Sequence, residues 1–387
     1  MTDSLASTTS TKVQLKDCCE EIAQRIDNPA ESGFERFVGL EHLETGETSI
    51  RNWGSTEDVT SSMKLFKAGD VIVARRNVYL RRASRAHFDG LCSGDGIVLR
   101  SKPGICLPDL LPFLLNTDAF WEYVTSQADG TMSKRITVKR LLSYEFALPP
   151  LEEQRRIAEV LQAANSYSGS LDSMCEAAEQ AHRALRLRLF RLDASPRWDR
   201  SGKLPEGWNK TAIGEVAEFL DGKRVPLKSA DRAQRQGPYP YYGASGVIDH
   251  IDDYIFDEDL LLVSEDGANL IDRTTPIAFE VSGKIWVNNH AHVLRAKPPF
   301  SNFFISEYIE SLNVEPFVTG SAQPKINKAA CESIPIPLPP TDVLADIEQK
   351  LRGSVAVLKA CRERGSASKE VTQAALRELL ITKGAEL

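Results

Sequence analysis

Two stretches of the chain carry apolar or small side chains at alternating spacings of four and three residues. The positions of the first stretch are Ile157, Leu161, Ala164, Ser168, Leu171, Cys175, Ala178, His182, Leu185, Leu189 and Leu192. This spacing is typical of the buried seam of a coiled coil, held here for about five heptads. It predicts a long helix over residues 149–194 that opens at the Pro149-Pro150 pair, because proline fits the first turn of a helix.

The second stretch repeats the first one 190 residues further along the chain. Its positions are Ile347, Leu351, Ser354, Leu358, Cys361, Gly365, Ser368, Thr372, Ala375, Leu379 and Thr382. The pattern predicts a second long helix over residues 339–383. Its second half is weaker, and Val371, Leu376 and Leu380 are alternative packing positions there. We expect the two helices to pair as a coiled coil, antiparallel if a two-fold axis relates the repeats. The alternative is that each helix packs on its own globular domain.

The same offset relates segments outside the helices. Gly130–Ile136 aligns with Gly320–Ile326, and Leu148–Pro150 aligns with Leu338–Pro340, both at a distance of 190 residues. Such self-similarity predicts two copies of one structural unit. We therefore expect a disordered tail over residues 1–11, a first domain over residues 12–148, and a second domain with its preceding linker over residues 195–338.

Each domain is expected to mix short strands with helices. The expected strands are Val71–Ala74, Ile97–Arg100, Leu260–Ser264 and Lys284–Val287, and the expected helical pieces are Pro108–Gln127 and Ser301–Leu312. The fold class is therefore α/β (α+β), with two repeated domains separated by two long helices in a pseudo-two-fold symmetric arrangement.

Composition narrows the class of protein. The chain has 387 residues, 42% of them hydrophobic, which suits two or three domains with real cores. It contains no run of eighteen apolar residues, so we expect no membrane span. The seven cysteines are scattered and form no Cys-x-x-Cys pair. We expect free thiols in the reducing cytoplasm.

Several catalytic signatures are missing from the sequence. It has no phosphate-binding Gly-x-x-x-x-Gly-Lys-Ser/Thr loop, no Gly-x-Ser-x-Gly motif and no cluster of Cys and His with metal-ligand spacing. We therefore expect a binding protein with no catalytic residue and no metal site.

Charge is unevenly distributed along the chain. The net charge of -7 argues against a generic nucleic-acid binder. However, Lys64–Arg100 holds eight Lys and Arg residues against three acids, whereas Asp249–Asp266 holds eight acids and no Lys or Arg. A basic face on the first half would suit DNA, although a solvated loop explains the arginines about as well.

Several motifs resemble the specificity subunits of type I restriction-modification systems. Leu204-Pro205-Glu206-Gly207-Trp208 is similar to the opening motif of a target-recognition domain in that family. Tyr241–Gly246, Glu265–Ala268 and Trp286–Ala291 resemble a recurrent version of that domain, and Leu148–Ile157 resembles the link into its spacer helix. The first domain lacks the Leu-Pro-x-Gly-Trp opening, and the second link, Leu338–Asp342, lacks the Glu-Gln-Arg pattern.

The resemblance implies a non-catalytic, DNA-specificity subunit of a DNA adenine methyltransferase and type I endonuclease complex. Each target-recognition domain would read one half of a bipartite double-stranded DNA target. The spacer helices would set the gap between the halves and dock two modification subunits, which restriction or translocase subunits would join. S-adenosylmethionine, ATP and Mg would belong to those partners, so this chain itself would hold no cofactor.

The candidate DNA contacts are polar residues expected on loops. They are Arg75, Arg76, Arg81, Arg82, Arg85, Lys134, Arg135, Lys223, Arg224, Lys284, Asn288, Asn289, His290, Lys325 and Lys328. Arginine and lysine bridge phosphates or grip guanine edges, and amides read base edges. For each basic residue the competing interpretation is a solvated surface charge, and for Asn288 to His290 it is the capping of a strand or turn. The competing function is a protein-interaction scaffold in which DNA plays no part; the absent motifs oppose a fused nuclease or methyltransferase.

Overall fold

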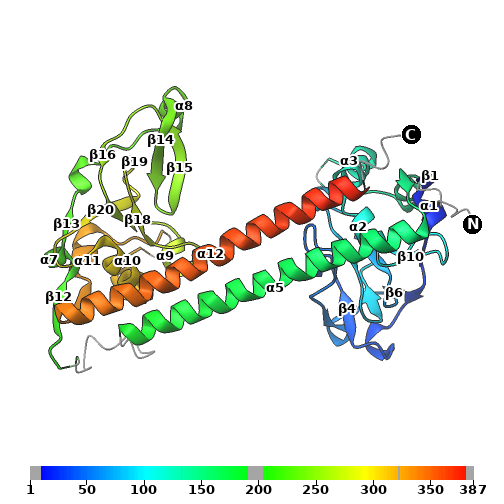
Figure 1. Cartoon of the computed structure of the whole chain (residues 1–387), viewed down its shortest axis with the longest axis horizontal. Helices are drawn as coiled ribbons and strands as arrows, with labels where there is room; N and C mark the ends of the chain where they lie inside the picture. Colours follow the sequence, from blue (N-terminus) through cyan, green and yellow to red (C-terminus); the bar gives the residue numbers. More distant parts are fainter. Residues whose placement is uncertain (1–9, 132, 191–203, 205, 321–322, 381–387) are drawn as a thin grey trace, which may run out of the picture. The chain divides into compact units, whose positions relative to one another are not determined.

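The computed structural model describes residues 10–131, 133–190, 204, 206–320 and 323–380. These residues form two compact units. The first unit comprises the chain up to Asp172 together with the part from Arg364 onward, and the second unit comprises Ser173–Glu363. Each unit therefore contains one sheet-rich domain and parts of both long helices (Figure 1).

The first domain contains three sheets. Strand β1 (Thr11–Gln14) pairs with β11 (Glu145–Leu148). The second sheet has the order β2 (Cys19–Glu21), β10 (Gly96–Ser101), β7 (Val71–Ala74) and β8 (Ala83–Arg85). The third has the order β3 (Arg25–Ile26), β6 (Met63–Phe66), β9 (Gly90–Cys92), β4 (Arg36–Val38) and β5 (Gly54–Ser55). Its α-helices are α1 (Leu15–Cys18), α2 (Leu111–Leu114), α3 (Asp118–Gln127) and α4 (Val138–Leu142).

The second domain repeats the first two of these sheets. Strand β12 (Asn209–Ala212) pairs with β21 (Pro335–Leu338), and the four-stranded sheet has the order β13 (Ala217–Phe219), β20 (Ala291–Ala296), β17 (Leu260–Ser264) and β18 (Ala278–Val281). The third sheet differs, with the order β15 (Gly246–Ile251), β14 (Gln236–Gly243), β19 (Lys284–Val287) and β16 (Phe256–Asp257). The α-helices are α7 (Ile213–Val216), α8 (Ser229–Ala233), α9 (Asn269–Asp272), α10 (Asn302–Ser311) and α11 (Lys328–Ser333). The predicted α+β fold with two repeated domains is confirmed.

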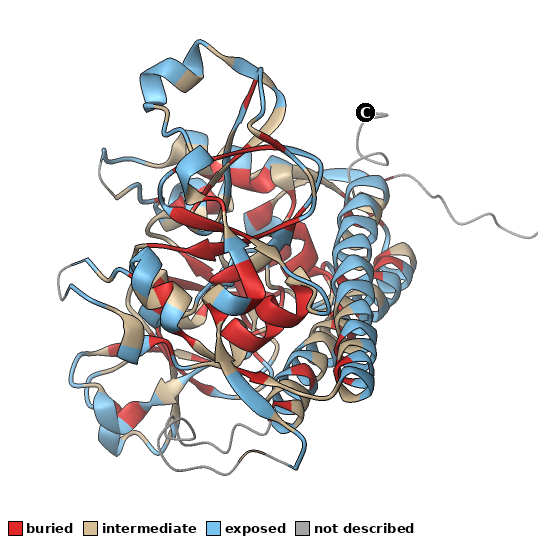
Figure 2. Cartoon of the chain, turned by 90° about the vertical axis from the view of Figure 1, so that its left-hand side faces the viewer, coloured by how far each residue is buried: buried red, intermediate tan, exposed pale blue. Residues whose placement is uncertain are grey.

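The central strand of each four-stranded sheet is buried on both faces. In β7, Val71 and Val73 belong to a core shared with the helices, whereas Ile72 and Ala74 belong to a second core against the third sheet. Side chains alternate between the faces of a strand, so a strand covered on both sides reads as a continuous apolar run. Strand β17 behaves in the same way, and Figure 2 shows the buried residues gathered inside the domain.

The two long helices are α5 (Leu151–Leu189) and α12 (Thr341–Leu380), with 39 and 40 residues. In the first unit the Ser168 hydroxyl lies 2.7 Å from that of Ser368, and Leu161 and Leu376 share one core. In the second unit His182 Nδ1 lies 3.1 Å from Ser354 Oγ. Rising numbers on α5 meet falling numbers on α12, so the helices pair antiparallel within each unit.

Each end of the helix pair is also part of a domain core. Ile157 and Leu161 lie in the core of the first domain, and Ile347 and Leu351 lie in the core of the second. Pairing and domain packing, which the sequence presented as alternatives, therefore both occur. The seam positions within the described residues are all buried or half-buried. Val371 is 66% exposed and packs less than the sequence suggested, whereas Leu376 is buried.

The first turn of α5 is fixed by one buried amide. The Gln154 side chain donates to the carbonyl oxygens of Ile105 (2.9 Å) and Pro149 (2.8 Å) and accepts from the amide of Leu107 (2.9 Å). The residue 190 positions later is Leu344, which is buried in the apolar core of the second domain. The two links therefore differ in sequence because one binds the domain through hydrogen bonds and the other through apolar packing.

The element boundaries differ slightly from those predicted. Strand β1 begins at Thr11, inside the predicted tail, and residues 1–9 of that tail lie outside the described residues. Helices α5 and α12 begin two residues after the predicted starts, and residues 191–194 and 381–383 of the predicted helices lie outside the described part. So do seam positions Leu192 and Thr382, and residues 195–203 and 205 of the predicted linker.

Candidate nucleic-acid interface

The end of the central strand meets the same two segments in both domains. In the first domain the amide of Arg75 donates to Asp95 O (3.0 Å), and the amide of Ile136 donates to Arg75 O (3.0 Å). In the second domain the amide of Glu265 donates to His290 O (2.9 Å), and that of Ile326 donates to Glu265 O (2.8 Å). We call these places the first and second junctions. The two junctions have the same pattern of main-chain hydrogen bonds, which we call their common backbone frame. Their side chains can therefore be compared position by position.

The first junction is basic. It carries Arg75, Arg76, Lys134 and Arg135 beside two acids, Asp95 and Asp129, and Asp129 is already paired with Arg140 at 2.5 Å. The Asp95 carboxylate lies 3.2 Å from Arg76 Nη1 and 3.8 Å from Arg75 Nε. Lys134 and Arg135 are exposed, and neither forms an ion pair with any residue that the structure describes. Asp95 therefore offsets the charge of two arginines only in part, and Lys134 and Arg135 leave further positive charge at the surface.

In the second junction the charge is reversed at the two positions that follow the central strand. Glu265 and Asp266 stand where the first junction has Arg75 and Arg76, and His290 stands where it has Asp95. The Asp266 carboxylate lies 2.9 Å from His290 Nδ1, and Lys325 Nζ lies 2.9 Å from Glu265. The acids here are paired inside the domain, which leaves the second junction close to neutral.

Behind the second junction lies a buried charged cluster. Asp221, Glu265 and His292 offer ligand atoms within 4.8 Å of one another, a spacing that could hold a metal ion. However, Arg224 Nη1 already lies 2.6 Å from Glu265 and Arg224 Nη2 lies 3.4 Å from Asp221. The carboxylates are thus neutralised by protein cations, which disfavours a metal and makes this an internal ion-pair network.

The pKa of each carboxyl group in this cluster reflects its hydrogen bonds. His292 Nδ1 lies 2.7 Å from the Asp221 carboxylate and Nε2 lies 2.9 Å from the Ile326 carbonyl oxygen. Both ring nitrogens therefore face oxygen atoms that accept hydrogen bonds. Burial would raise the pKa of Asp221, but the hydrogen bonds from His292 and from the main chain hold it below its usual value. Burial also acts to raise the pKa of Glu265, but hydrogen bonds from Arg224 and Lys325 outweigh it and lower that pKa.

The other candidate arginines of the first domain are used inside it. Arg81 pairs with Asp118 at 2.8 Å, Arg85 pairs with Asp109, and Arg82 Nη1 donates to Leu40 O. Burial lowers the pKa of Arg82 from its ordinary value. The cluster of arginines seen in the sequence is therefore largely neutralised by partners that lie far away along the chain.

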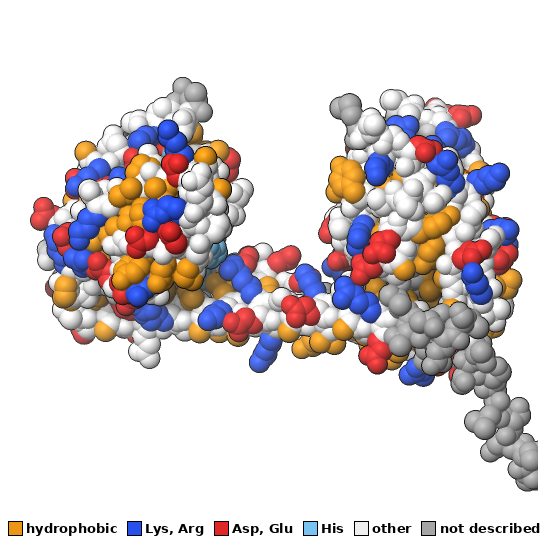
Figure 3. Space-filling view, turned by 90° about the horizontal axis from the view of Figure 1, so that it is seen from above, with side chains coloured by type: hydrophobic (Ala, Val, Ile, Leu, Met, Phe, Trp, Pro, Cys, Tyr) orange, Lys and Arg blue, Asp and Glu red, His pale blue; other side chains and the backbone are white. Residues whose placement is uncertain are grey.

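Of the remaining candidates in the second domain, some are exposed at the surface and others are occupied by contacts within the domain. Lys223 and Asn289 are exposed, and Lys284 Nζ lies 4.7 Å from the ring centre of Tyr254. By contrast, Asn288 is buried and its side chain accepts from the amide of His290 (2.7 Å), which is the capping role weighed against base reading. Lys328 lies 3.5 Å from Glu332 on its own helix. Figure 3 accordingly shows blue and red side chains interspersed over the visible faces of both domains.

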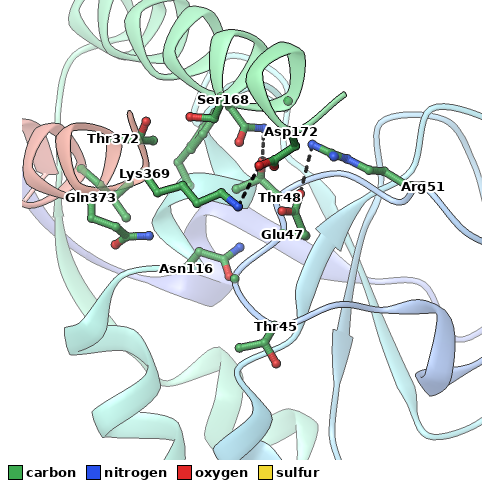
Figure 4. A pocket seen from close by; sticks show the side chains of 15 residues that line it. Thr45, Glu47, Thr48, Arg51, Asn116, Ser168, Asp172, Lys369, Thr372 and Gln373 are labelled. Atoms are coloured by element: carbon green, nitrogen blue, oxygen red, sulfur yellow. Dashed lines mark hydrogen bonds and ion pairs between the residues drawn. The ribbon is translucent and has the colours of Figure 1, made fainter. Parts of the chain in front are cut away.

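A polar cleft of about 240 Å³ lies within the first unit. The loop Thr45–Arg51 forms one wall, and parts of α5 and α12 together with Phe113 and Asn116 form the others. Figure 4 shows the Asp172–Lys369 ion pair (3.0 Å) at its rim. A hydrogen bond runs from Asn165 to Thr48 (3.0 Å) nearby. The hydrogen bond fastens the loop to α5, and the ion pair joins α5 to α12. The described lining contains no nucleophile paired with a base.

The family described as the type I restriction modification DNA specificity domain matches residues 10–167 and 205–351. The chain belongs to this family. Each match coincides with one of the two repeats seen in the fold, so the repeat is a repeat of the specificity domain.

Individual relatives agree with this assignment. A type I restriction enzyme specificity subunit of Haemophilus influenzae is 35% identical over 145 residues, which are 38% of this chain and 37% of the relative. The MjaX specificity subunit of Methanocaldococcus jannaschii is 23% identical over 366 residues, 88% of this chain and 85% of the relative. The S subunit of a type I restriction-modification system from M. genitalium has a similar fold, with a TM-score of 0.63 and 16% identity over 97% of this chain and 98% of that one.

Three features of the specificity chain were not evident from the sequence. The equivalence of the two junctions in space follows only from their shared main-chain hydrogen bonds. The ion pairs of the arginines join residues distant in sequence. Exposed apolar side chains such as Tyr79 (61%) and Ile271 (42%) look like core residues in a one-dimensional pattern. No described helix is long and apolar enough to span a membrane.

Proposed function

We propose that the chain is the DNA-specificity subunit of a type I restriction-modification complex and that each domain reads one half of a bipartite target. The observation that supports this most is the pair of junctions, which combine one backbone frame with exchanged charges. Two domains that read different sequences from equivalent surfaces need this combination, because the scaffold positions the loops and the side chains supply specificity. This charge difference supports the proposal independently of the family match, which covers both repeats.

The junctions suggest which candidates contact DNA directly. Lys134, Arg135 and Lys223 are exposed without an ion pair among the described residues, so they are free to neutralise phosphates. Arg75 and Arg76 share one acid and retain net positive charge. In contrast, Arg81, Arg82, Arg85 and Arg224 hold loops in place, because their guanidinium groups already bind within the domain.

The long helices suit a spacer. A helix of 39 residues is about 58 Å long, compared with about 34 Å for one turn of DNA. In this proposal the helix length sets the number of unread base pairs between the half-sites. Each domain then sets its own half-site independently.

The outer face of the helices suits a protein partner. Val160, Tyr167 and Met174 follow one another at seven-residue intervals on α5 and are 44%, 58% and 53% exposed. On α12, Val357 and Val371 are 55% and 66% exposed. Apolar side chains repeated along one helix face mark an interaction surface. In this proposal two modification subunits dock along it, and restriction or translocase subunits join them.

The chemistry would belong to those partners. The modification subunits would bind S-adenosylmethionine and methylate adenine, and the restriction subunits would use ATP and Mg. The specificity chain would contribute recognition alone. The cleft is lined mainly by polar residues, and the buried cluster is an internal ion-pair network. Both suit a subunit without a reaction centre.

Selection of randomised duplex DNA tests the proposal. The chain is mixed with its modification subunits, bound DNA is recovered and sequenced, and binding is repeated at rising salt. We expect two short fixed sequences separated by a constant gap, and an affinity that falls steeply with salt because phosphate contacts release counterions. A protein-interaction scaffold would enrich no sequence, and that result would reject the proposal.

A further inference from the structure

We infer that Tyr79 in the first domain and Ile271 in the second are apolar reading residues, each of which contacts base edges of its own half-site in double-stranded DNA. The inference rests on the proposed function and extends it to two residues outside the set of basic and amide contacts. It starts from a short turn that follows the central strand in both domains.

In the first domain this turn is η4 (Val78–Leu80), directly after the first junction. Val78 is 1% exposed and packs in the domain core, whereas the next residue, Tyr79, is 61% exposed. The residues on either side of the turn, Asn77 (φ 52°) and Arg81 (φ 49°), both have left-handed backbone conformations that non-glycine residues rarely adopt. The turn is therefore held in one unusual shape that points an aromatic side chain away from the core.

Contacts on both sides keep this turn rigid. The amide of Asn77 donates to Lys134 O (2.9 Å), and Ser133 Oγ donates to the Asn77 side chain (3.0 Å). On the other side Arg81 pairs with Asp118 at 2.8 Å. Tyr79 therefore lies on a turn held in place from both sides, next to the exposed cations of the first junction. The charge of those cations suits the phosphates that flank a DNA groove.

The second domain builds an equivalent platform from different residues. After β17, Gly267 has φ 112° and its amide donates to Pro324 O (3.0 Å). Leu270 is 1% exposed in the core, and the next residue, Ile271, is 42% exposed. Arg273 closes the turn with φ 52° and donates to Leu312 O (2.6 Å). Both turns therefore have a buried apolar residue followed by an exposed one, and both end at an arginine with a left-handed backbone conformation.

This repetition is what a reading role predicts. An exposed tyrosine or isoleucine on a pinned turn contributes little to folding, because its side chain remains in water. In a DNA groove the same side chain gains contact with a thymine methyl group or a base step. Because one turn carries a ring and the other a branched aliphatic chain, the two half-sites would differ.

The test uses the complex of the chain with its modification subunits and the randomised-duplex selection described above. Tyr79→Ala should relax base preference at one or two positions of one half-site, with about a tenfold to hundredfold loss of discrimination there. Ile271→Ala should relax the other half-site only. Tyr79→Phe should keep the wild-type preference, since it keeps the ring. The matched control is Ile105→Ala, which removes a 43% exposed apolar side chain elsewhere in the first domain and should change nothing.

The outcomes separate this inference from the proposed function. A bipartite motif that is unchanged in both Tyr79→Ala and Ile271→Ala would overturn the inference and leave the proposed function intact. Loss of assembly with the modification subunits in these variants would also overturn it, because the residues would then be protein contacts. Absence of any bipartite motif with the unaltered chain would reject the proposed function itself.

Discussion

Replacement of Gln154 by leucine tests how the first domain is fixed to its spacer helix. Gln154 is 1% exposed and makes three side-chain hydrogen bonds to the main chain. Leucine has a similar volume but no polar atoms, so Gln154→Leu leaves the Leu107 amide and the carbonyl groups of Ile105 and Pro149 without these partners. Each unsatisfied buried group costs about 1–3 kcal/mol, and the apolar gain from leucine returns about 1–2 kcal/mol.

The expected result is a loss of about 2–4 kcal/mol in the unfolding free energy of the first unit. For a unit of this size that corresponds to a Tm lower by roughly 5–15 °C. The assay is thermal unfolding of the purified chain, with Gln349→Leu as control, because the same change at an exposed position of α12 should stay within about 0.5 kcal/mol. A Gln154→Leu chain as stable as the control would refute the hydrogen-bonded link.

Three further predictions concern the proposed function, and a fourth concerns the buried ion-pair network. Arg135→Ala should lower the slope of log affinity against log salt by about one, since one phosphate contact is lost, and an unchanged slope in a binding titration would remove Arg135 from the interface. Joint deletion of residues 173–179 and 359–365 removes one heptad from each long helix and shortens the helix pair by about 10 Å. DNA selection should then yield a gap between the half-sites that is about three base pairs shorter, and an unchanged gap would refute the spacer role of the helices. Tyr167→Lys should weaken assembly with modification subunits on size-exclusion chromatography while thermal stability is kept, and normal assembly would argue against that face. The lowered pKa of Glu265 means that its stabilising effect is present above about pH 4.5 and is lost as the pH falls through the folded-state value. Glu265→Gln should therefore be less stable at neutral pH but lose less stability on acidification, and equal acid sensitivity would contradict the ion-pair network.

The sequence predicted the elements that have a strong period. Strands β7, β17 and β19 begin and end at the predicted residues, because each is a short apolar run. The long helices followed from the heptads. Their described seam positions are buried or half-buried as predicted, whereas of the alternative packing positions on α12 Val371 is exposed and Leu376 lies in the domain core. Local periodicity cannot decide between such positions, because the choice depends on the partner surface.

The candidate site was less predictable for a physical reason. Whether Arg81 or Arg85 is available to DNA depends on Asp118 and Asp109, which the fold brings close from 37 and 24 residues away. The charge exchange between Arg75-Arg76 and Glu265-Asp266 was already present in the 190-residue alignment. Its meaning required the shared hydrogen bonds of the two junctions, which establish that these residues are equivalent in space.

Methylome sequencing of the host with and without this gene tests the central claim most directly. The account predicts that one bipartite adenine-methylated motif, two short sequences around a fixed unread gap, is present with the gene and vanishes without it. A methylome that is identical in the two strains, although the modification partner is expressed, would contradict the assignment of this chain as the specificity subunit.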